Sequence, residues 1–234
     1  MKINPSKSDK DVFLAKLLKN ADFETGFYQL PAIKSTPIIK PKGLVLWSRR
    51  HHCDDKGSHA LIFYEYDSFF DGKDGIYNIL KYGSDLRIQT LIEELKHFAF
   101  VVCPDYSVYG NFPIYKQIEA IAKSREVGYI LQSLGVKVIA NFRATHEWSY
   151  ELALSGLSIG QTVAIGSLGA LRDKESRELL KNSITELASC VSPKVVIVYG
   201  SVPEDVFAPL KERGTEIWQF ESQIMKAFSQ KGDD

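Results

Sequence analysis

The sequence predicts an α/β protein with a mostly parallel sheet of about seven strands that alternate with helices. Three observations predict this class. Short apolar runs with strand chemistry recur along the chain, amphipathic segments separate most of them, and several runs are apolar on both sides of the pleat. Strands that are apolar on both faces are typical of parallel sheets, because helices cover such sheets.

The expected strands are short runs of branched and aromatic residues. They are Leu44–Trp47, Ala60–Tyr64, Phe98–Cys103, Val136–Asn141, Thr162–Gly166, Val195–Tyr199 and Thr215–Phe220. Strands joined through helices form βαβ units, whose right-handed crossovers bring the carboxyl ends of all strands to one side. Seven strands of this kind fit either a TIM-barrel-like fold or a doubly wound open sheet, and the pattern leaves both open.

Helical patterns lie between the strands and at both ends of the chain. The expected helices are Asp9–Asn20, Leu86–Phe98, Pro113–Leu134, Asp173–Ala188, Pro203–Arg213 and Glu221–Gln230. Asp173 has the chemistry of an N-cap, and Gly135 and Gly214 follow two of the helices as stop signals. We therefore expect an N-terminal helix and extended lead-in at 1–42, a single α/β domain at 43–230 and a frayed tail at 231–234.

Charge and composition exclude few functions, but they do not favour nucleic-acid binding or a membrane partner. Lys plus Arg and Asp plus Glu both number 29, so the chain is neutral, and a neutral chain does not favour nucleic-acid binding. The three cysteines, Cys53, Cys103 and Cys190, form no close pair, which suits a reducing compartment. No signal peptide and no apolar run of bilayer length is recognisable, so we expect a cytoplasmic protein without a membrane partner.

Polar side chains follow the expected strands, where parallel α/β folds bind their ligands. The candidate catalytic residues are Asp67, Asp105 and Glu147, and the candidate ligand-binding residues are Tyr106, Ser107, Tyr109, Asn141, Arg143, Tyr199, Gly200 and Ser201. The alternative is ordinary loop chemistry, since loops at strand ends lie at the surface and are polar.

The segment CPDYSVYGNFP (103–113) is the most informative of these loops. Asp105 stands at the carboxyl tip of an expected strand, where it can act as a general base, hold a ribose hydroxyl or orient a basic side chain. The competing interpretation is an Asx turn, in which the Asp105 carboxylate accepts N–H groups of its own loop.

The other motifs are less informative about function. No Gly-rich nucleotide pattern and no G-x-S-x-G nucleophile elbow is present, so the sequence specifies no cofactor. The segment HHCDDKGSH (51–59) contains metal-ligand residue types, but they are contiguous and have no second Cys/His pair elsewhere. A solvated loop is the favoured interpretation, and we predict no metal site.

Five motifs in order resemble a known family. They are FYEYD (63–67), PDYS-x-Y-x-x-x-P (104–113), G-x-x-x-Q-x-x-G-V-x-VI (128–139), VAIGSLG (163–169) and P-x-x-x-I-x-YG (193–200). In this order they resemble the family catalogued as domain of unknown function 4417, found in phages, plasmids and bacterial genomes. The sequence departs from the family where Gly110 replaces an Arg and where a Trp is shifted to Trp148. The resemblance implies a phage or mobile-element context and brings no known activity.

Three functions remain open. The first is an enzyme, or a degenerate one, that binds a small phosphorylated or nucleoside-type ligand at the strand ends through Asp105 and Arg143. The second is a nucleic-acid accessory factor that uses Arg49, Arg50 and Lys56. The third is an interaction module without catalysis. We favour the first, because a parallel sheet gathers polar groups from several strands.

Overall fold

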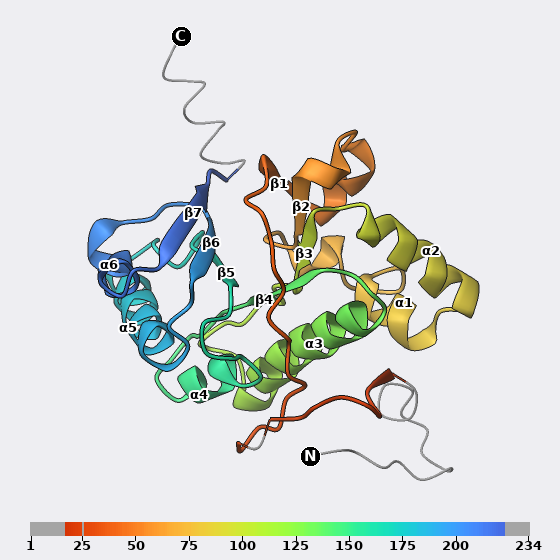
Figure 1. The fold of residues 1–234 in the computed structure, drawn as a ribbon. Coiled ribbons are helices and arrows are strands. Elements are labelled where there is room, and N and C mark those ends of the chain that lie inside the picture. The colour runs from red at the N-terminus through yellow and green to blue at the C-terminus, as the bar shows by residue number, and fades with distance from the viewer. Residues whose placement is uncertain (1–16, 25, 223–234) are drawn as a thin grey trace.

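The computed structural model describes residues 17–24 and 26–222 of the chain (Figure 1). Seven parallel strands form one sheet, and their order in the sheet is their order in the chain. The strands are β1 (Gly43–Leu46), β2 (His59–Ile62), β3 (Phe100–Val102), β4 (Val138–Asn141), β5 (Val163–Gly166), β6 (Val195–Tyr199) and β7 (Glu216–Phe220). Each overlaps a strand expected from the sequence, so the predicted fold class is confirmed.

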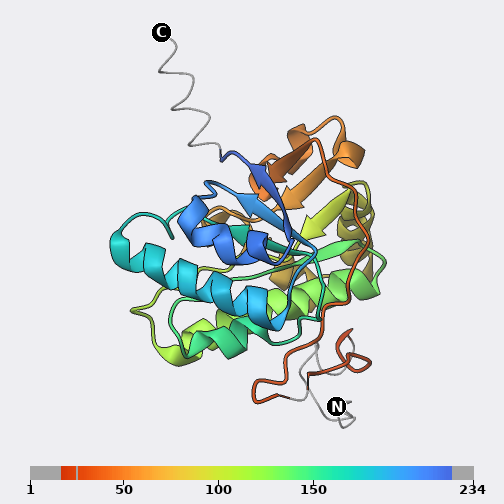
Figure 2. The same ribbon diagram turned by 60° about the vertical axis from the view of Figure 1, so that its left-hand side comes forward.

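The strand order decides between the two predicted architectures. Every crossover steps in the same direction, and right-handed crossovers then place the connecting segments on one face of the sheet. Figures 1 and 2 show the helices outside a strongly curved sheet. A doubly wound sheet would reverse its direction and carry helices on both faces. The fold is therefore nearly a barrel, with β1 and β7 as its two edges and no ladder between them in the described residues.

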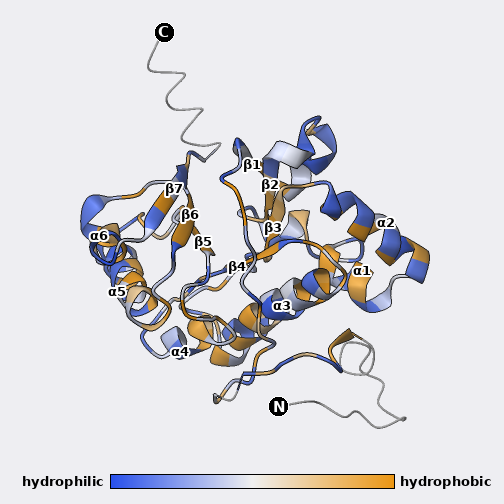
Figure 3. Ribbon diagram, viewed as in Figure 1, coloured by the Kyte–Doolittle hydropathy of each residue, from blue (hydrophilic) through white to orange (hydrophobic). Residues whose placement is uncertain are grey.

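The inner face of the curved sheet holds a layer of side chains from every strand. Alternation along each strand explains it: Ile197 and Tyr199 of β6 point inward, while Val196 and Val198 pack under the outer helices. The buried inner cluster consists of Leu46, Ala60, Ile62, Tyr64, Phe100, Val102, Ile139, Ala164, Ile197, Tyr199 and Trp218. Because both faces of the central strands are buried, these strands are largely apolar, whereas the edge strand β7 exposes Glu216 and Gln219. Figure 3 shows apolar colour on most strand residues.

The outer layer of the described residues contains six α-helices. They are α1 (Ile76–Tyr82), α2 (Asp85–Lys96), α3 (Ile114–Ser133), α4 (Ser149–Leu154), α5 (Lys174–Cys190) and α6 (Glu204–Glu212). Four correspond to predicted helices. The predicted cap is also found, since the Asp173 side chain accepts a hydrogen bond of 2.8 Å from the Ser176 N–H at the start of α5. The predicted helices 9–20 and 221–230 lie largely outside the described residues.

The connection from β1 to β2 differs from the others. Two short 3₁₀-helices, η2 (Trp47–His52) and η3 (Lys56–Ser58), stand where a βαβ unit would carry an α-helix. A third 3₁₀-helix, η4 (Asp67–Phe69), follows β2. None of the helices that the structure describes combines the length and apolarity that crossing a bilayer requires.

The segment before β1 is folded onto the barrel. Leu18, Phe23 and Leu30 are buried in the cluster beneath the helices, and the Ile33 N–H donates to the Gly156 carbonyl at 3.0 Å. Figure 1 shows this segment crossing the molecule from the region below α3 to β1. The lead-in therefore adds to the outer core.

Candidate functional site

Polar side chains from three neighbouring strand ends meet in one hydrogen-bonded chain. The Tyr64 hydroxyl, beyond β2, donates to Asn141 Oδ1 at 2.8 Å. Asn141, the last residue of β4, donates from Nδ2 to Asp105 Oδ1 at 2.7 Å. Arg143 lies two residues further on and also binds Asp105. The parallel register of β2, β3 and β4 brings these residues together from distant parts of the sequence.

The Asp105–Arg143 pair has side-on bidentate geometry. Arg143 donates from Nε to Asp105 Oδ1 at 2.5 Å and from Nη2 to Asp105 Oδ2. The Asp105 side chain is 8% exposed and the Arg143 side chain 25% exposed, so the guanidinium forms the solvent side of the pair. Burial by itself lowers the pKa of Arg143, but the adjacent Asp105 carboxylate outweighs burial and raises that pKa above its usual value. Arg143 is therefore a permanently charged group.

Tyr64 is a buried member of this hydrogen-bonded chain. Burial, followed by the negative charge of Asp105, raises the pKa of Tyr64 well above its usual value, so the phenol is a neutral donor. Its ring stacks on Tyr199 at 5.6 Å between centroids, with 11° between the planes. The ring also lies on Gly166, where an added Cβ would be 2.6 Å from a Tyr64 ring carbon. Glycine at position 166 thus leaves room for the Tyr64 ring.

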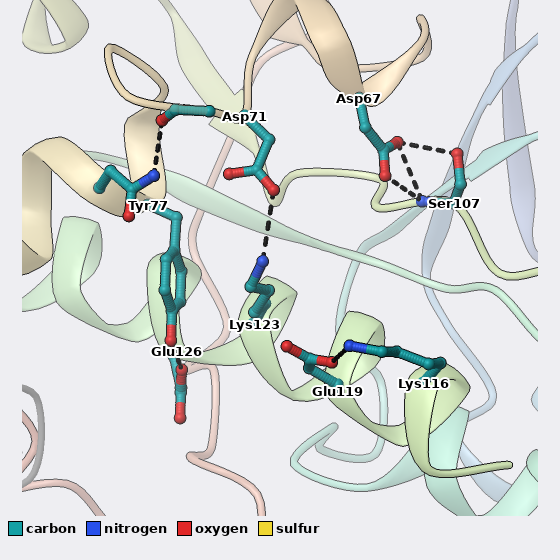
Figure 4. A network of polar contacts seen from close by, with 10 residues as sticks. Asp67, Asp71, Tyr77, Ser107, Lys116, Glu119, Lys123 and Glu126 are labelled. Carbon is teal, nitrogen blue, oxygen red and sulfur yellow. Dashed lines mark hydrogen bonds and ion pairs between the residues drawn. The ribbon is translucent and has the colours of Figure 1, made fainter. Parts of the chain in front are cut away.

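Asp67 lies beside the chain and makes a different contact. Its carboxylate accepts the Ser107 N–H at 3.1 and 3.2 Å and the Ser107 hydroxyl at 2.8 Å (Figure 4). This bridge joins η4 to the loop between β3 and α3. Figure 4 also shows Asp71 of the next turn paired with Lys123 of α3, at 3.3 Å. Asp67 therefore holds the loop at Ser107 in place, and its charge is among those that raise the pKa of Arg143.

The remaining predicted site residues lie apart from this chain. Tyr106 is buried and packs edge-on against Phe70, and it also lines the recess beside the Asp105–Arg143 pair. Tyr109 is 47% exposed and Glu147 is exposed, on the loops after β3 and β4. Gly200 has φ of +125°, and a Cβ there would come within 2.4 Å of Ser167 Oγ. Ser201 follows it in the loop after β6. The structure thus unites Asp105, Asn141 and Arg143.

Two residues that sequence reasoning did not assign to the site support it. Tyr64 is the first, and its signal was available: it continues the inward alternation of β2 beyond Ile62. Arg125 of α3 is the second. It is 1% exposed and donates from Nη1 to the Asn141 carbonyl at 2.8 Å, from Nη2 to the Ala153 carbonyl at 2.7 Å and from Nε to the Ser155 carbonyl at 3.1 Å. No helical pattern marks a buried arginine in advance.

A small recess opens beside the pair, between the ends of β3 and β4 and the middle of α3. Asp105, Asn141 and Arg143 line it from the strands, and Ala120, Ser124 and Arg125 line it from the helix. Its empty space is about 240 Å³ with the open mouth included, and its enclosed part has room for about one water-sized group.

The His51–His59 loop is held by protein groups. His51 Nδ1 lies 3.0 Å from Glu94 Oε1, and His59 Nδ1 lies 2.8 Å from the Asp55 carbonyl. Within residues 17–24 and 26–222, no three His, Cys, Asp or Glu side chains converge as metal ligands would. Arg50 of η2, directly before this loop, stacks over Trp47, with its guanidinium carbon 3.8 Å from the ring centroid.

Comparison with known proteins gives a family and two phage relatives. The family model described as "Domain of unknown function (DUF4417)" matches residues 23–221. The chain is similar to "Gene 1 protein" of Mycobacterium phage L5, with 27% identity over 177 residues, or 75% of this chain and 72% of the phage protein. It is also similar to "Gene 1 protein" of Mycobacterium phage D29, with 23% identity over 175 residues, or 74% of this chain and 60% of that protein.

Proposed function

The chain belongs to the DUF4417 family, and we propose that it binds a small anionic ligand of phosphorylated or nucleoside type at the carboxyl ends of its strands. Arg143 is the anion-binding residue in this proposal, and Asp105 is its positioning partner. The protein is then either an enzyme that acts on such a ligand or a degenerate enzyme that still binds the ligand and has lost its catalytic activity.

One observation carries the proposal: Arg143 is fixed by a buried carboxylate while part of its guanidinium stays accessible. The pair with Asp105 uses Nε–H and one N–H of Nη2. A guanidinium has five N–H groups, so three remain, and the described residues include no acceptor for them. Arginine held in this way presents a rigid fork to an anion, because its rotamer is set before the ligand arrives.

The other groups at the strand ends fit supporting roles. Asp105 can hold a ligand hydroxyl or transfer a proton, and Asp67 and Glu147 are further acid–base candidates on neighbouring loops. Tyr109 offers an exposed ring to a base or sugar, and the turn at Gly200 and Ser201 stands at the end of β6. The similarity to two phage proteins supports a phage or mobile-element setting, and we propose a cytoplasmic location.

A second candidate function rests on exposed aromatic residues in the loops after β2 and β3 and at the start of α3. Tyr66, Tyr109 and Tyr115 are 75%, 47% and 65% exposed. Exposed rings can stack on the bases of single-stranded nucleic acid, which binds without sequence preference and with strong salt dependence. This observation favours an accessory factor, whereas a protein-interaction module would use the same rings as an apolar contact.

The test is ligand-dependent stabilisation with matched variants. Thermal unfolding is measured with inorganic phosphate, nucleotides, nucleosides, sugar phosphates and single-stranded DNA, for the wild type, Arg143→Lys and Asp105→Asn. Arg177→Lys is the control, because Arg177 makes the same side-on pair with Asp205 on the exposed surface of α5 and α6.

The proposal expects a phosphate-bearing ligand to raise the melting temperature of the wild type and of Arg177→Lys, since a ligand that binds the folded state stabilises it. Arg143→Lys and Asp105→Asn should lose that increase. Stabilisation by DNA alone, lost at high salt and indifferent to Arg143, would instead support the accessory-factor function. An absence of any response to the anions would refute the proposed function.

A further inference from the structure

The recess beside the Asp105–Arg143 pair is built from buried polar groups. Asp105, Asn141 and Ser124, which line it, are 8%, 5% and 5% exposed. Arg125 also lines it, with three N–H groups already donated to main-chain carbonyls. Polar residues at this depth normally have hydrogen-bond partners, so an unmet group here marks a place where another molecule binds.

Ser124 has such an unmet group. Its Oγ is buried and has no hydrogen-bond partner within residues 17–24 and 26–222. A buried hydroxyl without a partner loses free energy, which a water molecule or a ligand group in the recess would restore. Ser183 of α5 provides the contrast, since it is equally buried but donates to the Leu180 carbonyl at 2.8 Å.

The Asp105 carboxylate also has capacity left. An ionised carboxylate offers about four acceptor positions, two on each oxygen. Asp105 Oδ1 accepts from Asn141 and from Arg143, which fills it, whereas Oδ2 accepts from Arg143 alone. One acceptor position therefore remains on Oδ2.

The recess thus offers a donor from Ser124 and an acceptor on Asp105, in a space for about one non-hydrogen group. A hydroxyl fits both groups, because it can donate to Asp105 Oδ2 and accept from Ser124 Oγ, whereas a carbonyl cannot donate to Asp105. An ammonium could donate to both, but it would place a positive charge beside the Arg143 and Arg125 guanidinium groups that line the recess. Arg143 also lines the recess and its side chain is 25% exposed, so its remaining N–H groups can reach an anion from solvent. The recess has room for one water-sized group, which a ligand hydroxyl can supply.

We infer that the ligand is a hydroxylated phosphate ester, such as a sugar or polyol phosphate, which places one hydroxyl in the recess between Ser124 and Asp105 while its phosphate binds Arg143. This inference rests on the proposed function and adds the class of the ligand. Ser124 is the residue that makes the site select for a hydroxyl.

The experiment compares two probes that differ only in hydroxyl groups. Glycerol 3-phosphate and propyl phosphate have the same charge and the same three-carbon chain. Inorganic phosphate is the third probe and tests the anion site by itself. Dissociation constants are measured by calorimetric or NMR titration for the wild type, Ser124→Ala, Arg143→Lys and the control Ser183→Ala.

In the wild type and in Ser183→Ala, glycerol 3-phosphate should bind about tenfold more tightly than propyl phosphate, which corresponds to about 1.4 kcal/mol. Ser124→Ala should reduce this ratio several-fold and leave the affinity for propyl phosphate and phosphate unchanged. Arg143→Lys should weaken all three probes. A crystal structure with glycerol 3-phosphate should place one hydroxyl oxygen within hydrogen-bonding distance of Ser124 Oγ and Asp105 Oδ2.

The two proposals fail in different ways. Equal affinities for glycerol 3-phosphate and propyl phosphate, both dependent on Arg143, would overturn the hydroxyl inference and leave the anion site standing. A preference for glycerol 3-phosphate that survives Ser124→Ala would also overturn it. If none of the three probes binds in a manner that depends on Arg143, the proposed function is wrong and the inference falls with it.

Discussion

Replacing Arg125 by methionine should lower the free energy of unfolding by about 3–5 kcal/mol. Arg125 is a fully buried cation whose partners are three main-chain carbonyls, of Asn141, Ala153 and Ser155. Burial lowers its pKa, and no carboxylate of the part of the chain that the structure describes accepts a hydrogen bond from it. Methionine keeps an unbranched stem of good helix propensity and removes every donor.

The magnitude follows from the contacts. A hydrogen bond from a charged donor contributes roughly 1.5–3 kcal/mol, and three are lost. Part of that loss is offset, because the variant no longer desolvates a guanidinium, and breaking a buried charged arrangement typically costs about 3–5 kcal/mol. For a domain of this size the melting temperature should fall by roughly 6–20 °C.

The assay is urea unfolding followed by tryptophan fluorescence, with thermal unfolding by circular dichroism. The matched control is Arg177→Met, which removes an exposed arginine of α5 from its pair with Asp205. That variant should remain close to the wild type, since exposed ion pairs contribute little. If Arg125→Met unfolds at the same urea concentration as Arg177→Met, the three carbonyls have other partners and the reasoning about Arg125 is refuted.

Three further predictions follow from single contacts. Burial raises the pKa of the Cys103 thiol from its usual 9.0 to about 11, so between these pH values the unfolded chain loses the thiol proton while the folded protein keeps it. The free energy of unfolding should therefore fall by about 3 kcal/mol from pH 9 to pH 11. Urea unfolding of Cys103→Ala should show a smaller fall over the same range. Gly200→Ala combines positive φ with a clash and should destabilise by about 2–4 kcal/mol, against about 1 kcal/mol for Gly169→Ala, which has positive φ and open space. Asp67→Ala should release the loop at Ser107 and speed amide exchange there about tenfold.

Each has a contrary result. An unchanged alkaline slope in Cys103→Ala would assign the pH dependence to another group, with Tyr64 as the candidate, because burial also raises its pKa. Equal losses in the two glycine variants would mean that the backbone accommodates the new Cβ at 200. Unchanged amide exchange in Asp67→Ala would show that η4 is not what holds the loop.

The strands and the long helices were predictable because their signals are local. The β6 run VVIVY is apolar on both faces, and its bounds agree with the structure. The cap at Asp173 needs only two neighbouring residues. In contrast, α1 and α4 are 7 and 6 residues long, too short for helical periodicity to stand out. The choice of a nearly closed barrel depends on strand order, which no local pattern encodes.

The site was predictable in outline for the same reason. Parallel strands put Asp105, Asn141 and Arg143 at one edge, and the structure joins them. Tyr64 donates to a residue 77 positions away, so its role depends on register between strands. Asp67 looks equally suited to catalysis in the sequence, but its partner Ser107 lies 40 positions away. The sequence indicated that the site lies at the carboxyl ends of the strands, but it did not show which side chains bind each other there.

Asn141 is where the stability of the fold and the geometry of the site meet. Its carbonyl accepts from Arg125, its Oδ1 accepts from Tyr64 and its Nδ2 donates to Asp105. Because one residue at the end of β4 makes all three contacts, a change at Arg125 that leaves the protein folded should still move Asp105. Losses of stability and of anion affinity should therefore appear together in Arg125 variants. Ser124→Ala should leave both unchanged and reduce only the preference for a hydroxylated ligand, since Ser124 Oγ has no hydrogen-bond partner among the described residues.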